Sequence, residues 1–134
     1  MKSTAILKCL AKGVLYLSIV WLMFSAAGTV GLAADEQWYE VGTCTISHYC
    51  PCARCNGRAG QPTASGVMPE RYRTVAVDPK VIPLNSRIYI EGYGYRIAED
   101  TGVSGHWVDV FTDDHNYALQ LGLKKRRVWI IKEE

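Results

Sequence analysis

The chain has 134 residues, the length of a single domain with a core of its own. Of its 15 basic residues three precede Asp35, so the part from Asp35 onward carries 12 basic against 13 acidic residues. This near-neutral balance excludes the strong positive field of a nucleic-acid-binding protein, and we expect no nucleic-acid partner.

The first 34 residues differ from the rest. Their only charged side chains are Lys2, Lys8 and Lys12. An almost wholly apolar run from Gly13 to Phe24 follows, and the segment ends in small residues. This order predicts a secretory signal peptide over 1–34, cleaved near its end. The alternative is an uncleaved membrane anchor, because 13–34 is just long enough to span a bilayer. In either case we expect one exported domain over 35–134, with membrane contact only through the N-terminal segment.

Short apolar runs follow, separated by turn residues. Alternating apolar and polar side chains predict six strands, at 37–46, 73–77, 86–91, 93–99, 107–111 and 127–132. The sequence Gly92-Tyr93-Gly94 indicates a tight hairpin between two of them. The segment 47–71 is dense in Cys, Gly and Pro, and a loop of this length is usually functional or cross-linked.

One helix is expected, over 114–121. Thr112 or Asp113 can cap its start and Gly122 suits its end. The basic run 124–127 is expected to be a solvated turn, with contact to an anionic polymer outside the cell as the alternative. Many short strands with one helix favour a small, closed, mainly-β barrel.

Three aspartates lie at or inside the apolar runs. Asp78 ends the run 75–77, Asp100 precedes a Thr-Gly turn, and Asp109 lies within 107–111. A carboxylate in or beside a strand is costly unless it is solvated, hydrogen-bonded or functional. We therefore expect the three to share one polar groove.

These motifs, in this order, resemble the 3D domain, which is named for three aspartates. The matching segments are Thr63-Ala64-Ser65-Gly66, Thr74-Val75-Ala76-Val77-Asp78-Pro79, Val81-Ile82-Pro83-Leu84, Arg87-Ile88-Tyr89-Ile90-Glu91-Gly92-Tyr93-Gly94, Ala98-Glu99-Asp100-Thr101-Gly102 and Val108-Asp109-Val110. The resemblance extends over about 41–131. The link after Asp100 departs from the family pattern: it is shorter, with only four residues, 103–106, before Trp107.

The resemblance implies a six-stranded double-psi β-barrel with one short helix, preceded by the signal helix. It is similar to the catalytic barrel of lytic murein transglycosylase A and to stationary-phase survival muralytic proteins of Gram-positive bacteria. Those enzymes cleave peptidoglycan between N-acetylmuramic acid and N-acetylglucosamine and leave a 1,6-anhydro sugar. The implied partner is therefore the glycan strand of peptidoglycan, and the implied reaction needs no cofactor and no metal.

By motif position Asp78, Asp100 and Asp109 are the three aspartates of the family name, and the resemblance implies that they are the catalytic residues. Asp109 resembles the acid/base of the transglycosylase. A neighbouring carboxylate such as Asp100 would raise the pKa of Asp109, which suits a group that must deliver a proton near neutral pH. Each aspartate also has a structural interpretation: Asp109 as a buried carboxylate satisfied by amides, and Asp100 and Asp78 as turn residues. Strand alternation places Trp107 and Asp109 on one face, so Trp107 could stack on a sugar or merely cover the barrel end.

Thr63, Ser65 and Thr101 complete the predicted substrate-binding residues, with the formation of turns as the alternative for Thr63 and Ser65.

Four cysteines lie beyond the signal segment: Cys44, Cys50, Cys52 and Cys55. In a small exported domain two disulfides are the first expectation, with three possible connectivities. The second is a zinc site formed by the last three cysteines together with Cys44 or His48. We expect His48, His106 and His115 to be ordinary surface or loop residues. The competing functions are a cell-wall binding module without activity and a Cys-centred metal or redox protein.

Overall fold

The computed structural model describes residues 35–133. The predicted signal peptide or anchor lies outside these residues. The described chain consists of β1 (Glu36–Tyr49), α2 (Ala53–Asn56), β2 (Thr74–Val77), β3 (Arg87–Ile90), β4 (Gly94–Asp100), β5 (Trp107–Phe111), α3 (His115–Leu121) and β6 (Lys124–Glu133). Within 35–133, neither helix has the length and apolar character that crossing a bilayer requires.

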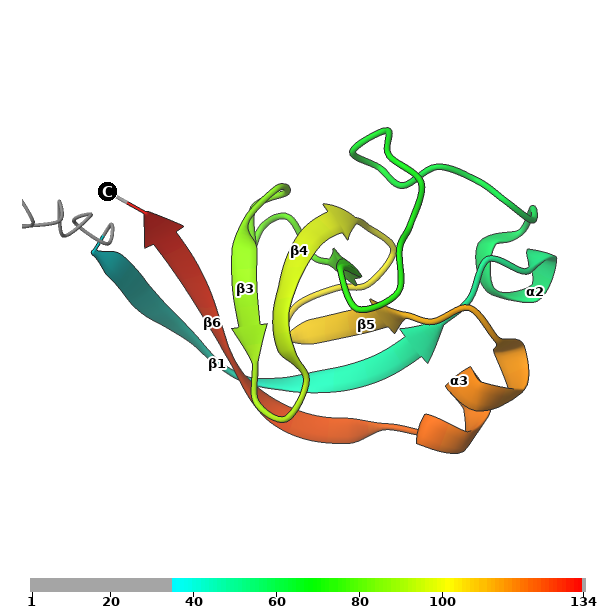
Figure 1. Cartoon of the computed structure of the whole chain (residues 1–134). Helices are drawn as coiled ribbons and strands as arrows, with labels where there is room; N and C mark the ends of the chain where they lie inside the picture. Colours follow the sequence, from blue (N-terminus) through cyan, green and yellow to red (C-terminus); the bar gives the residue numbers. More distant parts are fainter. Residues whose placement is uncertain (1–34, 134) are drawn as a thin grey trace, which may run out of the picture. The chain divides into compact units, whose positions relative to one another are not determined.

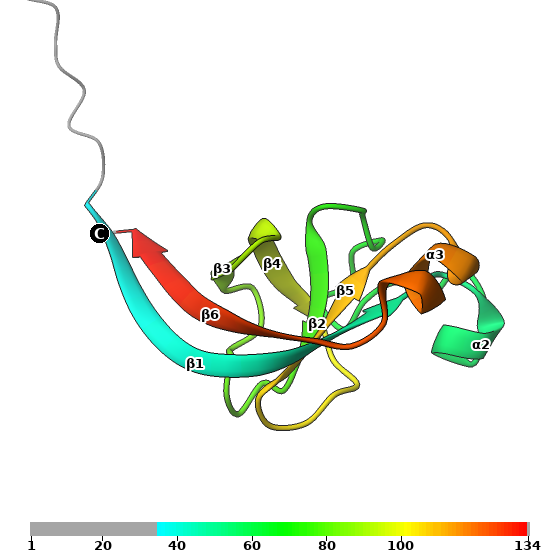
Figure 2. The same cartoon turned by 90° about the horizontal axis from the view of Figure 1, so that it is seen from below.

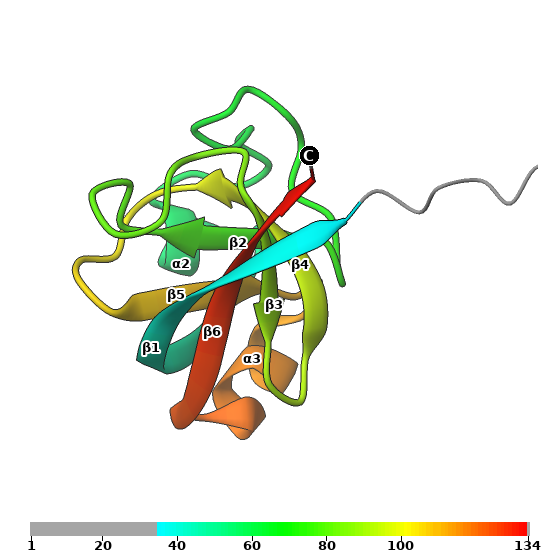
Figure 3. The same ribbon diagram turned by 90° about the vertical axis from the view of Figure 1, so that its left-hand side faces the viewer.

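The six strands close into a barrel in the order β1-β5-β2-β4-β3-β6 (Figure 1, Figure 3). β1 pairs in parallel with β5, and β2 with β4, whereas the other four pairs are antiparallel. Because every strand pairs with two neighbours, the sheet closes on itself. The predicted six-stranded, mainly-β barrel is confirmed.

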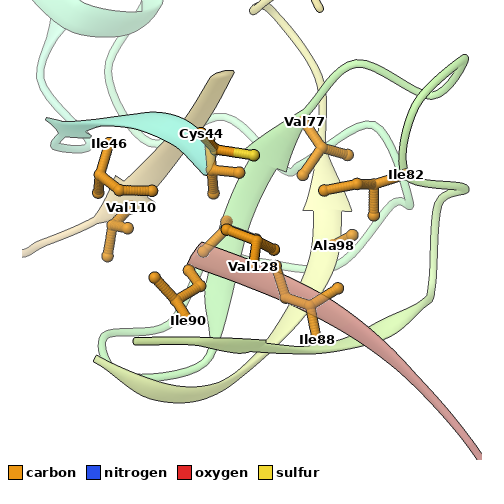
Figure 4. Packing of buried hydrophobic residues seen from close by; sticks show 11 residues of the cluster. Cys44, Ile46, Val77, Ile82, Ile88, Ile90, Ala98, Val110 and Val128 are labelled. Atoms are coloured by element: carbon orange, nitrogen blue, oxygen red, sulfur yellow. The ribbon is translucent and has the colours of Figure 1, made fainter. Parts of the chain in front are cut away.

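The barrel interior is filled by alternate side chains of all six strands (Figure 4). Burying each Ile or Val side chain contributes about 1.5–3 kcal/mol. The valines of β5, Val108 and Val110, point inward as strand alternation predicts. The buried cluster comprises Cys44, Ile46, Val75, Val77, Ile82, Ile88, Ile90, Ala98, Val108, Val110 and Val128.

β1 and β6 form a long ribbon that extends beyond the barrel (Figure 1). Their register shifts between Glu40 and Gly42, and Gly42 has φ +106°, a conformation that glycine adopts without strain. β6 begins at Lys124, so the expectation of a solvated turn at 124–127 is wrong. Backbone pairing with β1 holds these residues in the sheet, and Lys125 Nζ donates to Thr45 Oγ1 at 2.6 Å.

Two further elements differ from expectation. β1 continues to Tyr49, because its residues 47–49 pair in parallel with 109–111 of β5, a partner that local sequence cannot show. The predicted helix is present as α3, but its cap is Asp114, whose carboxylate accepts from Tyr117 N at 2.7 Å. The loop after β1 also contains the four-residue helix α2, which lies beside α3 at one end of the barrel (Figure 1, Figure 2).

Candidate active site at Asp100 and Asp109

β2 lies between the two strands that carry the central aspartates. Ala76 of β2 is in register with Asp100 of β4 on one side and with Asp109 of β5 on the other. Adjacent strands are about 4.8 Å apart, so the two aspartate backbones are separated by about 10 Å. Ala76 itself is buried and carries only a methyl group. The two carboxyl groups therefore lie close enough to influence each other's ionisation.

Asp109 is half-buried and is held by a short relay of hydrogen bonds. Ser47 Oγ donates to Asp109 Oδ1 at 2.8 Å, and Trp107 Nε1 donates to Ser47 Oγ at 2.7 Å. Burial raises the pKa of Asp109, the charge of Asp100 raises it further, and the bond from Ser47 opposes both. The balance favours the protonated acid more than in an ordinary aspartate.

Asp100 has a different environment, because its carboxylate accepts three hydrogen bonds. Ala64 N and Thr101 N donate to Oδ1 at 3.0 and 2.9 Å, and Tyr49 Oη donates to Oδ2 at 3.0 Å. Burial and the negative charge of Asp100 raise the pKa of Tyr49, so the phenol keeps its proton and remains a donor. These three contacts fix the orientation of the Asp100 carboxylate beside Asp109.

Asp78 does not belong to this pair in the structure. Its carboxylate accepts from Lys80 N at 3.0 Å and from Gly105 N at 2.7 Å. These bonds to backbone amides lower the pKa of Asp78. Among the described residues its hydrogen bonds thus go to a turn and to the short link 103–106, which is the structural alternative rather than the expected three-carboxylate cluster.

The predicted substrate-binding residues have unequal positions. Trp107 is 38% exposed beside Asp109, whereas Thr63 is buried and bonds Val67 O through both its amide and its hydroxyl. Ser65 N donates to Glu99 O at 2.9 Å, and Thr101 is exposed next to Asp100. Thr63 therefore forms a turn, as its structural alternative predicts. This turn positions the backbone amide of Ala64, which donates to Asp100 Oδ1.

Two residues of the site were missed by sequence reasoning. Ser47 and Tyr49 lie in the segment that was expected to be a loop, yet both are in β1 and on the same side of it. The signal that could have found them is the alternation of Cys44 and Ile46 on one face, which, if the strand is extended to Tyr49, places Ser47 and Tyr49 together on the other face. Their partners are 62 and 51 residues away, so composition alone does not reveal them.

A cavity of about 340 Å³ among the described residues has none of the three aspartates in its lining. It is lined by four cations and several tyrosines, among them Arg71, Arg96, Arg126, Lys124, Tyr72 and Tyr93. Arg96 is only 8% exposed. Within the described residues Arg96 Nε and Thr112 Oγ1, which both line the cavity, have no hydrogen-bond partner. The cavity is therefore suited to an anion.

The cysteines separate into two groups. Cys44 points into the barrel core (Figure 4), whereas Cys50, Cys52 and Cys55 gather around His115. All four described cysteines are free thiols, so the structure does not show the two disulfides that we expected. His115, which we expected to be an ordinary surface or loop residue, lies at the centre of these three cysteines, and neither Cys44 nor His48 belongs to the cluster. His48 instead bonds Tyr93 Oη and Gly122 O.

Residues 73–132 match the family model of the 3D domain, which confirms the resemblance. The chain is 38% identical over 115 residues to YabE of Bacillus subtilis (strain 168), named for cell wall shaping. It is 43% identical over 61 residues to the cell wall-binding protein YocH of the same organism. These alignments cover 80% and 44% of this chain, but only 28% and 21% of the relatives, so the chain spans about a quarter of their length.

Solved structures show partial likenesses. The lytic transglycosylase MltA from Escherichia coli aligns with a TM-score of 0.48 and 21% identity, over 57% of this chain and 28% of that chain. The lytic transglycosylase LtgG of Burkholderia pseudomallei aligns with a TM-score of 0.44 and 26% identity, over 56% and 27%. The barrel assignment for this chain rests on its own strand order.

Proposed function

We propose that this chain, whose residues 73–132 match the 3D domain, is an exported lytic transglycosylase that cleaves the glycan strands of peptidoglycan. The observation that carries the proposal is the unequal pair, a half-buried Asp109 with a raised pKa beside a triply hydrogen-bonded Asp100. Two carboxyl groups with different environments are what glycosidic cleavage requires. The names of YabE and YocH support a function at the cell wall.

In the proposed reaction Asp109 is the general acid and later the general base. Protonated Asp109 delivers its proton to the oxygen of the bond between N-acetylmuramic acid and N-acetylglucosamine, and that bond breaks. Asp100 supplies negative charge close to the developing oxocarbenium ion. The 6-hydroxyl of the muramic acid then closes onto its anomeric carbon and returns its proton to Asp109, which leaves a 1,6-anhydro sugar and restores the acid.

The surroundings of Asp109 fit a sugar substrate. Trp107 is exposed, and its indole N–H is committed to Ser47, so the ring is held in one orientation and can stack on a sugar face. The short link 103–106 borders the same strand and is fixed through Gly105 to Asp78. We therefore assign Asp78 to positioning this wall of the groove, with no contact to the reacting atoms.

Digestion of purified peptidoglycan tests the proposal. The full chain, kept in mild detergent because of its apolar segment 13–34, should release anhydro-muropeptides that mass spectrometry identifies. Asp109→Asn should abolish these products, and the matched control Asp113→Asn, an exposed aspartate paired with Arg71, should retain them. Products with ordinary reducing ends would instead indicate hydrolysis, and activity that persists in Asp109→Asn would reject the assignment.

A second candidate function is non-catalytic binding of a cell-wall polymer, and the cationic cavity favours it. A buried Arg96 with an unpartnered Nε, beside Lys124 and Arg126, suits a carboxylate or phosphate of such a polymer. Sedimentation with insoluble peptidoglycan measures this. Arg96→Met should lower the bound fraction, whereas Arg127→Met, outside the cavity and paired with Glu91, should not. Binding without any glycan cleavage would select this function over the first.

A further inference from the structure

Three cysteines and one histidine meet at the end of the barrel where α2 and α3 lie side by side (Figure 2). The distances from Cys50, Cys52 and Cys55 Sγ to His115 Nδ1 are 3.6, 3.4 and 3.6 Å. Cys50 Sγ lies 3.1 Å from Cys52 Sγ and 3.5 Å from Cys55 Sγ. All four atoms lie within 4.8 Å of one another.

Hydrogen bonding among these groups does not account for the arrangement. His115 Nδ1 has either one proton or one lone pair, so it can satisfy one of the three sulfurs that surround it. A disulfide requires two sulfurs about 2.05 Å apart and would leave the third cysteine and the histidine without a role. A single ion at the centre would satisfy all four atoms at once.

The distances match those of a tetrahedral site. With Zn–S of about 2.3 Å and Zn–N of about 2.0–2.1 Å, a sulfur and a nitrogen ligand lie about 3.6 Å apart and two sulfurs about 3.8 Å. The three sulfur–nitrogen distances agree with the first value. The sulfur–sulfur distances of 3.1 and 3.5 Å would have to lengthen by less than about 1 Å to reach the second. Three soft sulfurs and one imidazole nitrogen are the donor set that zinc prefers among common divalent ions.

We propose that Cys50, Cys52, Cys55 and His115 form a structural zinc site. The site is independent of the proposed glycan cleavage, because all four positions are protein ligands and none is left for substrate. On binding, three thiols lose their protons to solvent and the neutral imidazole contributes its Nδ1 lone pair, so the zinc centre carries a net charge of −1.

The backbone around the cysteines is already arranged for this role. Cys52 O accepts from Cys55 N at 3.2 Å and from Asn56 N at 3.1 Å, which forms the turn that brings Cys52 and Cys55 together. Asn56 Nδ2 donates to Cys50 O at 3.2 Å, and Gly60 N donates to Pro51 O at 3.0 Å. On the opposite side Asp114 caps α3, so that His115 is its first residue.

The ion would connect this loop to the candidate active site. Cys50 directly follows Tyr49, whose hydroxyl donates to Asp100, and Tyr49 O accepts from Thr112 N at 2.8 Å, three residues before His115. His115 is 60 residues from Cys55 in sequence. Joining such distant segments restricts the unfolded chain and stabilises the fold. The zinc site thus holds the end of β1 that carries Tyr49.

Metal analysis of the unmodified full chain is the first test. Purified in detergent under anaerobic conditions without chelator, it should contain one zinc per chain by elemental mass spectrometry. Replacement by Co²⁺ should produce the intense visible absorption of a tetrahedral ion together with thiolate-to-cobalt charge-transfer bands. Both measurements use the unmodified chain, so a variant that fails to fold does not affect them.

Ligand variants with matched controls are the second test. Cys55→Ser and His115→Ala should lower zinc affinity, measured by competition with a chromophoric chelator, by more than the roughly 10–100-fold cost of losing an outer-shell partner. Cys44→Ala, in the core, and His106→Ala, on the surface, should keep one zinc per chain. Glycan cleavage is not part of the readout, so a failure of the proposed function leaves this result unaffected.

Two outcomes would overturn the zinc site. One is a freshly prepared chain that binds neither zinc nor cobalt, especially if its mass is lower by two hydrogens because two of the cysteines are joined. The other is retention of one zinc per chain in the double variant Cys52→Ser, Cys55→Ser.

Discussion

Ser47 Oγ donates a hydrogen bond to Asp109 Oδ1 across the parallel pair β1–β5, and this bond acts against the burial that raises the pKa of Asp109. Ser47 stabilises the charged carboxylate, whereas burial and Asp100 favour the neutral acid. Beside burial, two residues therefore change the pKa of the proposed catalytic group in opposite directions, Ser47 downward and Asp100 upward, and each can be removed separately.

Removing Ser47 should raise the pKa of Asp109. A hydrogen bond to a charged group is worth about 1.5–3 kcal/mol, and one pH unit corresponds to about 1.4 kcal/mol, so Ser47→Ala should move the alkaline limb of the pH–activity profile upward by about one to two units. The profile of anhydro-muropeptide release measures this. Ser86→Ala, a serine outside the relay, should leave the limb in place, and a downward shift in Ser47→Ala would contradict the assignment.

Removing the charge of Asp100 should have the opposite effect on the same limb. Without its neighbour's negative charge Asp109 ionises more readily, so Asp100→Asn should lower the pKa of Asp109 and move the alkaline limb downward. A carboxyl carbon titration by NMR on the isotope-labelled chain gives the same quantity without activity. Asp113→Asn is the matched control, and an Asp109 titration unchanged by Asp100→Asn would show that the two groups do not interact.

Asp109→Asn should stabilise the fold at neutral pH while it abolishes cleavage. Because the folded-state pKa of Asp109 is raised, its favourable contribution is present below the unfolded value of about 3.9 and is lost as pH rises through the folded value. The side-chain amide of the variant has no charge to bury, so the free energy of unfolding at pH 7–8 should rise by about 0.5–1 kcal/mol. The midpoint of thermal unfolding should then be a few degrees higher. The gain should vanish below about pH 4, and a lower midpoint at pH 7 would contradict the argument.

Asp78→Asn should destabilise the fold at neutral pH. The pKa of Asp78 is lowered by the amides of Gly105 and Lys80, so its contribution is present above its unfolded value and is lost as pH falls through the folded value. The variant should unfold at a lower temperature than the unmodified chain near pH 7, and the two should converge in acid. Amide exchange at Gly105 should accelerate in Asp78→Asn, and unchanged exchange there would show that the carboxylate does not hold the link.

Much of the barrel could be predicted because its determinants are local. Alternation within 107–111 placed Val108 and Val110 in the core and Trp107 and Asp109 on the other face, and the structure has those bounds and that arrangement. Turn chemistry at Gly92 to Gly94 placed the β3–β4 hairpin. The ordered aspartate motifs indicated the 3D domain, which the match over 73–132 confirms.

The grouping of the functional side chains was decided only by the tertiary structure. Asp100 and Asp109 are neighbours because β2 is inserted between β4 and β5, whereas Asp78, equally conspicuous in sequence, bonds two backbone amides. His115 joins three cysteines that lie some 60 residues earlier, since α2 and α3 meet at one barrel end. Local patterns determine which face a side chain occupies; which distant side chain it meets depends on strand order and register, which periodicity within one segment does not contain.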